Sequence, residues 1–395
     1  MQNLLDRNNN TAILLAGIIA LVIGMGVARF AFTSLLPPML DDFLGLTFAG
    51  ILASVNFVGY LSGAIFAIFI KDMNTKVKYF RIGMVLCILT TLSLGLTTND
   101  TIWLISRVIA GFGSAMALVV GSAIVMTKLN FTDKTKAMGI HFSGIGLSIL
   151  VTDIISRVVL NLGGNWQTSW LILTIFGAVI TVYAIYILSF DQKVKQDEQQ
   201  HPFDKSLFSV FAIVLIIGYF TAGVGFVVQG TFLPDIIDSL EGLDGYGSFT
   251  WTIVGLAGIP SCIVWMRLAT RYGSVNMIMI ALLIQVVGIL IPTMTNNIYL
   301  NLLSGLLYGG TFVGLVALFL HLGGKLAGKN PVIMMGSLTA AYGIGQVTAP
   351  LYCVALVNYF GSYDYALYLT AAIVFSGVMI LFFTKRFNAN AHRCS

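Results

Sequence analysis

The sequence predicts an all-α polytopic membrane protein with twelve transmembrane helices, and three observations lead to this fold class. Hydrophobic residues make up 57% of the 395 residues and charged residues only 9%, whereas ordinary globular domains carry about 25% charged residues. The hydrophobic residues are gathered in long runs, each near the ~20 residues that cross a bilayer. All but three of the 21 Lys and Arg residues fall in every second gap between these runs. Because loops rich in Lys and Arg stay on the cytoplasmic side, this alternation predicts the topology.

The expected helices follow one another along the whole chain, and their even number places both termini in the cytoplasm. Their ranges are 11–36, 47–70, 79–97, 101–127, 136–160, 165–190, 207–234, 247–270, 275–294, 298–322, 332–357 and 363–384. The first run is too long for a signal-peptide core and carries Arg29, so we expect it to be retained as a helix. The net charge of +5 is explained by the inner loops and indicates no nucleic-acid partner.

The chain divides into two halves related by one shift. Residues 191–206 form the longest polar stretch. We therefore expect an N-terminal six-helix bundle at 1–190, a cytoplasmic linker at 191–206 and a C-terminal six-helix bundle at 207–395. A shift of 197 positions aligns the halves without a gap, matching Gly26 with Gly223, Pro37 with Pro234, Gly113 with Gly310, Met138 with Met335, Gly139 with Gly336 and Gly146 with Gly343. The constant offset indicates that helices one to six are repeated as helices seven to twelve.

Two six-helix halves with parallel repeats are the arrangement of major facilitator transporters. LISRVIAGFGSAM at 104–116 resembles the helix-four motif of that superfamily, and GYLSGA at 59–64 resembles its second helix. More specific segments are GMGVARFAFTSLLPPML (24–40), GIHFSGIGLSI (139–149), YFTAGVGFVVQGTFLPDI (219–236) and LLYGGTFVGLVAL (306–318). Together these segments resemble the YbfB/YjiJ-type subfamily over nearly the whole chain. The resemblance implies the major facilitator fold, with two pseudo-symmetric bundles, and a transporter of the bacterial inner membrane, without implying a substrate.

The inner loops depart from the superfamily pattern. In IFIKDMNTKVKYFR at 68–81, only Asp72 matches the acid of the loop signature, and in WMRLATRYG at 265–273 that position is Thr270. A cytoplasmic gate built on this acid is therefore not expected in the second half. Helix five also lacks the Pro that many drug/proton antiporters carry, which makes that subclass a poorer match.

Four charged residues lie well inside the expected spans, namely Arg29, Arg107, Asp153 and Arg157. Each would cost about 2.5–3.5 kcal/mol at a lipid-facing helix centre, so we expect them to point into the protein. One hypothesis is a substrate site for an anion, which Arg binds in a bidentate manner. The alternative is structural, because Asp153 and Arg157 are spaced i, i+4 and can neutralise each other. The positions that correspond to these charges in the second half are Phe226, Ser304, Pro350 and Val354, so the fold itself does not require them.

Asp153 is also the best candidate for a proton carrier. A carboxyl group in a low-dielectric environment binds a proton more readily, and a neighbouring Arg opposes this effect. His141 lies on the same expected helix, about 18 Å further inward. It is either a second relay point or a packed polar side chain.

The second half offers hydrogen-bonding groups without charge. The resemblance implies that helices one, four, seven and ten line the central cavity, which makes Gln229, Tyr308 and Thr311 candidate substrate contacts. Helix–helix packing explains each of them at least as well. Trp103, Trp166, Trp170 and Trp251 fall near the outer ends of spans, where an aromatic belt at the membrane interface is the simplest explanation.

Taken together, these residues predict a secondary active transporter that moves a small organic anion with protons by alternating access. The nearest alternative is proton-driven efflux of amphipathic compounds, and a membrane receptor or enzyme is a third class. We expect a monomer in the lipid bilayer. We do not expect an enzyme, because no nucleophile–His–acid set is visible at one membrane level. No nucleotide-binding or metal-binding spacing is present either, so no cofactor is expected.

Overall fold

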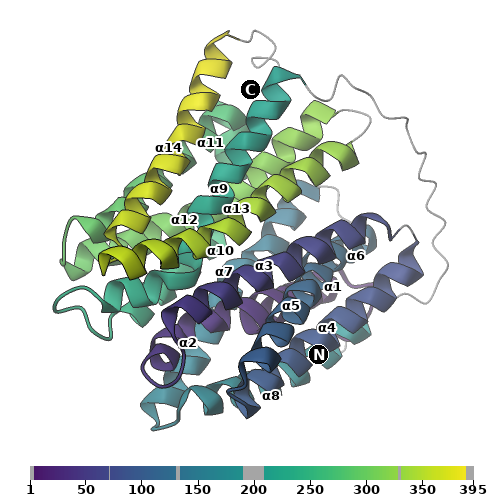
Figure 1. The fold of residues 1–395 in the computed structure, drawn as a ribbon. Coiled ribbons are helices and arrows are strands. Elements are labelled where there is room, and N and C mark those ends of the chain that lie inside the picture. The colour runs from purple at the N-terminus through teal and green to yellow at the C-terminus, as the bar shows by residue number, and fades with distance from the viewer. Residues whose placement is uncertain (1–3, 71, 130–133, 190–208, 328–330, 388–395) are drawn as a thin grey trace. The chain divides into compact units, whose positions relative to one another are not determined.

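The structure, a computed structural model, describes residues 4–70, 72–129, 134–189, 209–327 and 331–387 (Figure 1). Within these residues, twelve helices are long and apolar enough to cross a membrane. Their number and order agree with the helices expected from the sequence. In hydrocarbon, every backbone polar group needs a partner within the protein, and a helix supplies one along its own length. The fold is therefore the predicted polytopic helical one.

The chain forms two compact units, Met1–Asp197 and Glu198–Ser395. The first contains α1 (Asn10–Leu21), the π-helical η2 (Val22–Phe30), α2 (Ala31–Leu40), α3 (Leu46–Ile68), α4 (Met73–Leu96), α5 (Asp100–Ala115), the π-helical η3 (Met116–Val120), α6 (Gly121–Lys128), α7 (Lys134–Asn161) and α8 (Trp166–Ile187). The second contains α9 (Val210–Asp238), α10 (Gly247–Tyr272), α11 (Ser274–Leu290), the 3₁₀ turn η5 (Ile291–Thr293), α12 (Ile298–Ala327), α13 (Pro331–Phe360) and α14 (Asp364–Phe387). The whole of the expected linker at 191–206 lies outside the described residues.

Short polar residues begin several helices by capping their free backbone N–H groups. Asn99 and Asn165 accept hydrogen bonds from the N–H groups of Ile102 and Thr168. Asp72 caps α4 in the same way, with its Oδ1 atom 2.8 Å from the Thr75 nitrogen, and hydrogen bonds from the Thr75 side chain and backbone lower the pKa of this carboxyl group. This cap starts α4 at Met73 rather than at the expected residue 79.

The first helix of each unit continues past a proline. The segments α1, η2 and α2 form one span from Asn10 to Leu40 that includes Pro37, and α9 continues through Pro234 to Asp238. The sequence predicted ends at 36 and 234. Proline is tolerated in transmembrane helices because neighbouring helices and local changes in helical geometry satisfy the freed carbonyl groups.

Glycine residues bring particular helices into close contact. A Cβ atom added at Gly111 on α5 would lie 1.9 Å from the Asn56 carbonyl oxygen on α3. In the second unit, a Cβ atom at Gly309 on α12 would lie 2.3 Å from the Val254 carbonyl oxygen on α10. Helices two and four, and likewise eight and ten, therefore touch backbone to backbone, as small residues permit in membranes.

The two units repeat the same contact between their first and fifth helices. A Cβ atom at Gly26 would lie 2.9 Å from the Ser148 carbonyl oxygen on α7, and one at Gly223 would lie 2.4 Å from the Tyr342 carbonyl oxygen on α13. Gly26 and Gly223 are related by the 197-residue shift, so the repeated glycine serves the same packing function in both units.

In each unit, a carboxylate in or just after the first helix accepts a hydrogen bond from an aromatic side chain at the start of the sixth helix. Trp166 Nε1 donates to Asp42 Oδ2 over 2.8 Å, and the Tyr363 hydroxyl donates to Asp235. Trp166 and Tyr363 are also related by the 197-residue shift, whereas Asp42 and Asp235 are not. Burial and the nearby Asp235 carboxylate raise the pKa of Tyr363 well above its usual value, so the phenol remains a hydrogen-bond donor. We call these two contacts the aromatic–carboxylate clasps.

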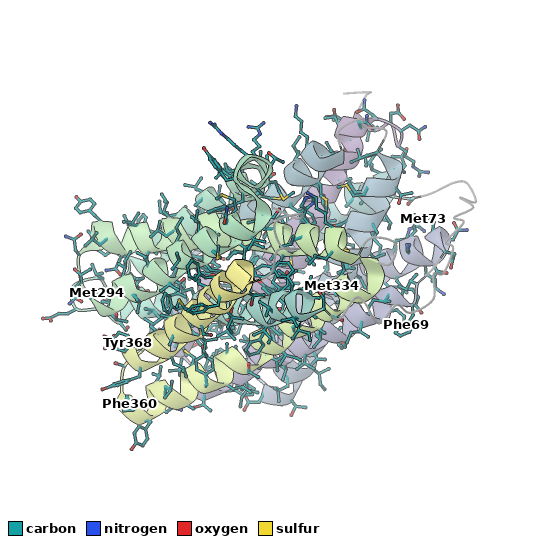
Figure 2. The ribbon with its side chains drawn as sticks, turned by 90° about the horizontal axis from the view of Figure 1, so that it is seen from above. Phe69, Met73, Met294, Met334, Phe360 and Tyr368 are labelled. Carbon is teal, nitrogen blue, oxygen red and sulfur yellow. The ribbon has the colours of Figure 1, made fainter. Side chains whose placement is uncertain are left out.

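The expected aromatic belt is not formed by tryptophan, and this prediction was wrong. Trp103, Trp170 and Trp251 are fully buried, and Trp166 is 2% exposed. Their large rings fill the interior of the helix bundles. Exposed Tyr and Phe rings occupy the C-terminal end of α13 and the N-terminal part of α14, and Figure 2 shows Phe360 and Tyr368 toward the end opposite Met334. These smaller aromatic residues have the exposure that an interfacial belt requires.

Candidate functional site

Helix one presents Arg29 from a π-helical stretch. The nine residues of η2 contain Gly24 and Gly26, at which a Cβ atom would lie 2.4 Å from Ala117 Cβ and 2.9 Å from the Ser148 carbonyl oxygen. The stretch is therefore held tightly between helices four and five. Such π-helical segments are rare and occur frequently at functional sites.

Side chains of helix four bind two carbonyl groups of this π-helical stretch. Arg107 Nη1 donates to the Ala28 carbonyl oxygen over 3.1 Å, and the Ser114 hydroxyl donates to the Gly24 carbonyl oxygen. A carbonyl oxygen has two lone pairs, so it can accept these bonds beside a helical one. Helix four thus fixes the backbone on the N-terminal side of Arg29.

Aromatic rings surround the Arg29 guanidinium. Its central carbon lies 4.2 Å from the centroid of the Phe57 ring, 5.2 Å from that of Tyr60 and 5.8 Å from that of Phe30. Contacts of a cation with ring faces contribute about 0.5–2 kcal/mol each, the upper values applying away from water. Arg29 is 5% exposed, so these rings offset part of the cost of burying its charge.

Arg107 is held from three sides. Its guanidinium carbon lies 4.5 Å from the centroid of the Phe32 ring, and its backbone oxygen accepts a hydrogen bond from Asn56 Nδ2 over 2.9 Å. With the bond to Ala28, these contacts place Arg107 directly beside the residue that precedes Arg29. The structure therefore brings together the two arginines that the sequence singled out on helices one and four.

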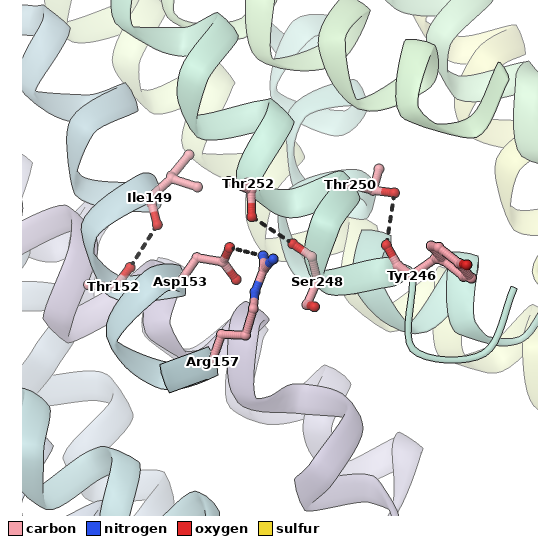
Figure 3. Close-up of polar contacts among 8 residues, drawn as sticks. All are labelled: Ile149, Thr152, Asp153, Arg157, Tyr246, Ser248, Thr250 and Thr252. Carbon is pink, nitrogen blue, oxygen red and sulfur yellow. Dashed lines mark hydrogen bonds and ion pairs between the residues drawn. The ribbon is translucent and has the colours of Figure 1, made fainter. Parts of the chain in front are cut away.

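Asp153 and Arg157 form the ion pair that their spacing allows (Figure 3). Arg157 Nη2 lies 2.6 Å from Asp153 Oδ2, and Asp153 is almost completely buried while the Arg157 side chain is 20% exposed. The pair carries no net charge when both groups are ionised. The positive charge of the site then comes from Arg29 and Arg107.

His141 lies elsewhere on the same helix. Its Nε2 atom is 2.8 Å from the Ser122 hydroxyl oxygen, and a Cβ atom at Gly17 would lie 2.7 Å from its Nδ1 atom. The ring is fully buried. Twelve residues of helix separate His141 from Asp153, about 18 Å along the axis, so the two groups are not in direct contact.

The neutral candidates of the second unit form hydrogen bonds within that unit. Gln229 Nε2 donates to the Gly288 carbonyl oxygen and lies near the Ser304 hydroxyl, each at 3.3 Å. The Tyr308 hydroxyl donates to the Phe226 carbonyl oxygen over 2.8 Å. Thr311 donates to the carbonyl of Leu307 in its own helix. Helix packing accounts for all of these bonds.

Sequence reasoning missed several residues that shape the site. Ser114 was named only as part of the helix-four segment at 104–116, and the rings of Phe32, Phe57 and Tyr60 were not singled out. A helical wheel drawn with 3.6 residues per turn does not predict these neighbours, because the π-helical stretch changes the register of helix one. The one signal in the sequence for this close packing was the pair of glycines, Gly24 and Gly26, that precede Arg29.

Comparisons with known proteins give the same architecture. A family described as "Uncharacterised MFS-type transporter YbfB" matches residues 21–382. Among solved structures, the crystal structure of a mutant of the nucleoside transporter NupG is similar, with a TM-score of 0.70 and 13% sequence identity over 94% of this chain and 99% of that chain. At this identity, the likeness to NupG shows the fold alone.

Proposed function

Because the chain belongs to the YbfB-type family of MFS, or major facilitator superfamily, transporters, we propose that it moves a small organic anion together with protons. A multi-pass membrane protein of this family is a secondary transporter that works by alternating access. The anionic substrate and the proton are our additions. We further propose a monomer in the bacterial inner membrane with both termini in the cytoplasm, a 1–190 bundle, a cytoplasmic linker and a 207–395 bundle.

The observation that carries the proposal is that the buried Arg107 side chain binds the carbonyl of Ala28, the residue that precedes the buried Arg29. Two like charges within one buried region repel each other, and in a low-dielectric environment this repulsion is strong. An anion bound between them would relieve it. Arg107 Nε has no hydrogen-bond partner among the described residues, and guanidinium groups bind carboxylate or phosphate through two parallel N–H bonds.

The proton is proposed to bind Asp153. This carboxylate is buried and its charge is balanced by Arg157. If the substrate attracts Arg157, Asp153 loses that balance and takes up a proton, because burial without a counter-ion favours the neutral acid. His141 is proposed as a second relay point on the same helix.

Gln229, Tyr308 and Thr311 remain proposed contacts for the uncharged part of the substrate. Gln229 Oε1 has no hydrogen-bond partner among the described residues, which supports Gln229 most strongly of the three. Tyr308 and Thr311 would each have to exchange a hydrogen bond within the helix bundle for one with the substrate. We therefore rank them below the arginines.

Efflux of amphipathic compounds is the second candidate function. The aromatic rings of Phe30, Phe32, Phe57 and Tyr60 beside the arginines favour a ligand with an apolar part. A site that recognises mainly such an apolar part would tolerate neutralisation of the arginines. An anion site would not, because each charge-assisted hydrogen bond contributes about 1.5–3 kcal/mol.

Matched ligand pairs test the proposal on the purified protein. Each pair consists of a metabolite carboxylic acid and its neutral amide, and thermal unfolding reports binding. We expect stabilisation by some acids, no stabilisation by their amides, and loss of the response in Arg29→Gln. Lys78→Gln is the control, because it removes an exposed positive charge near the beginning of α4 instead of a buried one. Equal responses to acid and amide would contradict the anion site and favour the amphipathic alternative.

A further inference from the structure

A groove opens on the second unit between α11 and α14, next to the end of α10. Its volume is about 540 Å³, and its lining includes Tyr272, Asn276, Met279, Leu283, Phe375 and Phe382. The lining residues of α11 belong to the first part of that helix and those of α14 to its last part. The groove therefore lies toward the end of the unit at which α10 finishes and α11 begins.

The groove is apolar and faces outward from its unit. Leu283, Phe375 and Phe382 are 40–47% exposed, although each is a large hydrophobic side chain. In a chain that crosses a bilayer, such a surface meets lipid hydrocarbon rather than water. From Asn276 to Leu283 the groove extends about 10 Å along α11, which fits within one leaflet of a ~30 Å hydrocarbon core.

One end of the groove carries polar and positively charged groups. Asn276 Nδ2 donates to the Tyr272 carbonyl oxygen over 2.8 Å. The Arg271 guanidinium carbon lies 5.2 Å from the centroid of the Tyr272 ring. Arg267 is one helical turn away, and both arginines are exposed. Arg271 thus lies beside Tyr272 at the end of the groove, and Arg267 lies on the same face of α10 one turn away from it.

We propose that this groove binds an anionic phospholipid, with an acyl chain along the apolar lining and the phosphate beside Arg271 and Arg267. The arrangement has the polarity of a lipid molecule, with apolar surface at membrane depth and positive charge at its boundary. Basic residues at such a boundary attract anionic headgroups, and a zwitterionic headgroup lacks the net charge that they select. The proposal rests on membrane location and is independent of the transported substrate.

The test compares two lipids on the purified full-length protein. Delipidated protein in mild detergent receives equal amounts of dioleoyl phosphatidylglycerol and dioleoyl phosphatidylcholine, and native mass spectrometry measures the bound lipids. With two arginines at the boundary, we expect about a tenfold preference for phosphatidylglycerol, which corresponds to 1.4 kcal/mol. Equal retention of the two lipids would overturn the assignment of an anionic headgroup.

Three variants locate the lipid. Leu283→Trp fills the groove and should abolish retention, and Met379→Trp fills it from α14 if the first variant does not fold. Leu256→Trp is the matched control, because Leu256 is 49% exposed on α10 outside the groove. Retention in a folded groove-filling variant equal to that in the control would overturn the proposal.

Two further measurements test the role of the two arginines and the possibility that the groove binds a second copy of the chain. Arg267→Gln combined with Arg271→Gln should remove the preference for phosphatidylglycerol while leaving the thermal unfolding of the lipid-free protein unchanged. Light scattering gives the oligomeric state. A parent dimer that becomes a monomer in Leu283→Trp, with lipid retention unchanged, would assign the groove to a subunit interface and overturn the lipid proposal.

Discussion

Helix one and its repeat, α9, have the same packing and different chemistry. Both place a glycine against the fifth helix of their unit, Gly26 in one and Gly223 in the other. Helix one changes to π-helical geometry over Val22–Phe30 and carries Arg29. In α9 the equivalent residue is Phe226, and α9 is α-helical from Val210 to Asp238. The packing residues are thus kept in both copies, whereas the charge occurs in one.

Helix four and α12 show the same contrast. Arg107 reaches the Ala28 carbonyl of helix one, whereas the equivalent Ser304 donates to the Gly288 carbonyl of α11. The second unit therefore folds without a charge at either position. The comparison teaches that Arg29 and Arg107 are not required by this architecture, which supports a role in substrate binding.

The largest expected effect concerns Asp153, whose counterpart in the second unit is Pro350. Asp153→Asn imitates the permanently protonated acid. We expect it to abolish accumulation driven by a pH gradient in proteoliposomes while substrate exchange at equal pH continues. Exchange at equal pH requires only substrate binding and the conformational change, and neither step needs a group that gains and loses a proton.

A purely structural ion pair gives a different result for the same variant. Asp153→Asn would then leave the partly buried Arg157 without its counter-ion, and thermal stability and every transport mode would decline together. Asp153→Asn combined with Arg157→Gln serves as the control, because it restores stability in the structural case without restoring coupling. Accumulation by Asp153→Asn equal to that of the parent would rule out Asp153 as the coupling residue.

The next largest effect compares two glycines at the same position of the repeat. A Cβ atom at Gly113 would lie 2.8 Å from both Cys87 Sγ and the Gly83 carbonyl oxygen, whereas at Gly310 it would meet nothing within 4 Å. Gly113→Ala should therefore lower the free energy of unfolding by about 1–3 kcal/mol through overpacking. Gly310→Ala should be neutral or stabilising by up to about 1 kcal/mol, because alanine favours the helix. Thermal unfolding in detergent measures both, and equal destabilisation would show that the two units pack alike here.

The smallest effect tests the aromatic–carboxylate clasps. Trp166→Phe and Tyr363→Phe each remove the hydrogen bond to the carboxylate and keep an aromatic ring. Each should lower the free energy of unfolding by about 0.5–1.5 kcal/mol, since the carboxylates lie near the ends of helices where water can replace the lost donor. Tyr368→Phe, at an exposed ring, is the control. A loss in only one of the two clasp variants would show that the contact stabilises one unit and not its repeat.

The sequence predicts the number and order of the helices well, because apolar run length is set directly by the bilayer. The exact ends are harder to predict. The expected spans ended at 36 and 234, but the helices continue past Pro37 and Pro234. The third span was expected to begin at 79, but Asp72 caps a helix that begins at Met73. Helix ends depend on local hydrogen bonds that apolar run length does not record.

The charged members of the site were visible in the sequence because charge inside an apolar span is rare. The side chains that surround them could not be predicted from the sequence. The Ser114 bond to Gly24 and the rings around Arg29 depend on the π-helical register of helix one. The tryptophans show the same limit, because a position near the membrane interface does not say whether a ring faces lipid or the bundle. Trp170 faces the bundle.

The most direct test of the anion site uses one ligand pair and one variant. The dissociation constants of a stabilising carboxylate and of its amide are measured by titration for the parent and for Arg107→Gln. We predict that Arg107→Gln weakens carboxylate binding by one to two decades, equivalent to about 1.5–3 kcal/mol, and leaves the weaker amide binding unchanged. Lys78→Gln, which removes an exposed charge on α4, should change neither constant. Equal loss of carboxylate and amide binding in Arg107→Gln would mean that Arg107 supports the fold rather than the charge of the substrate, and would contradict the account.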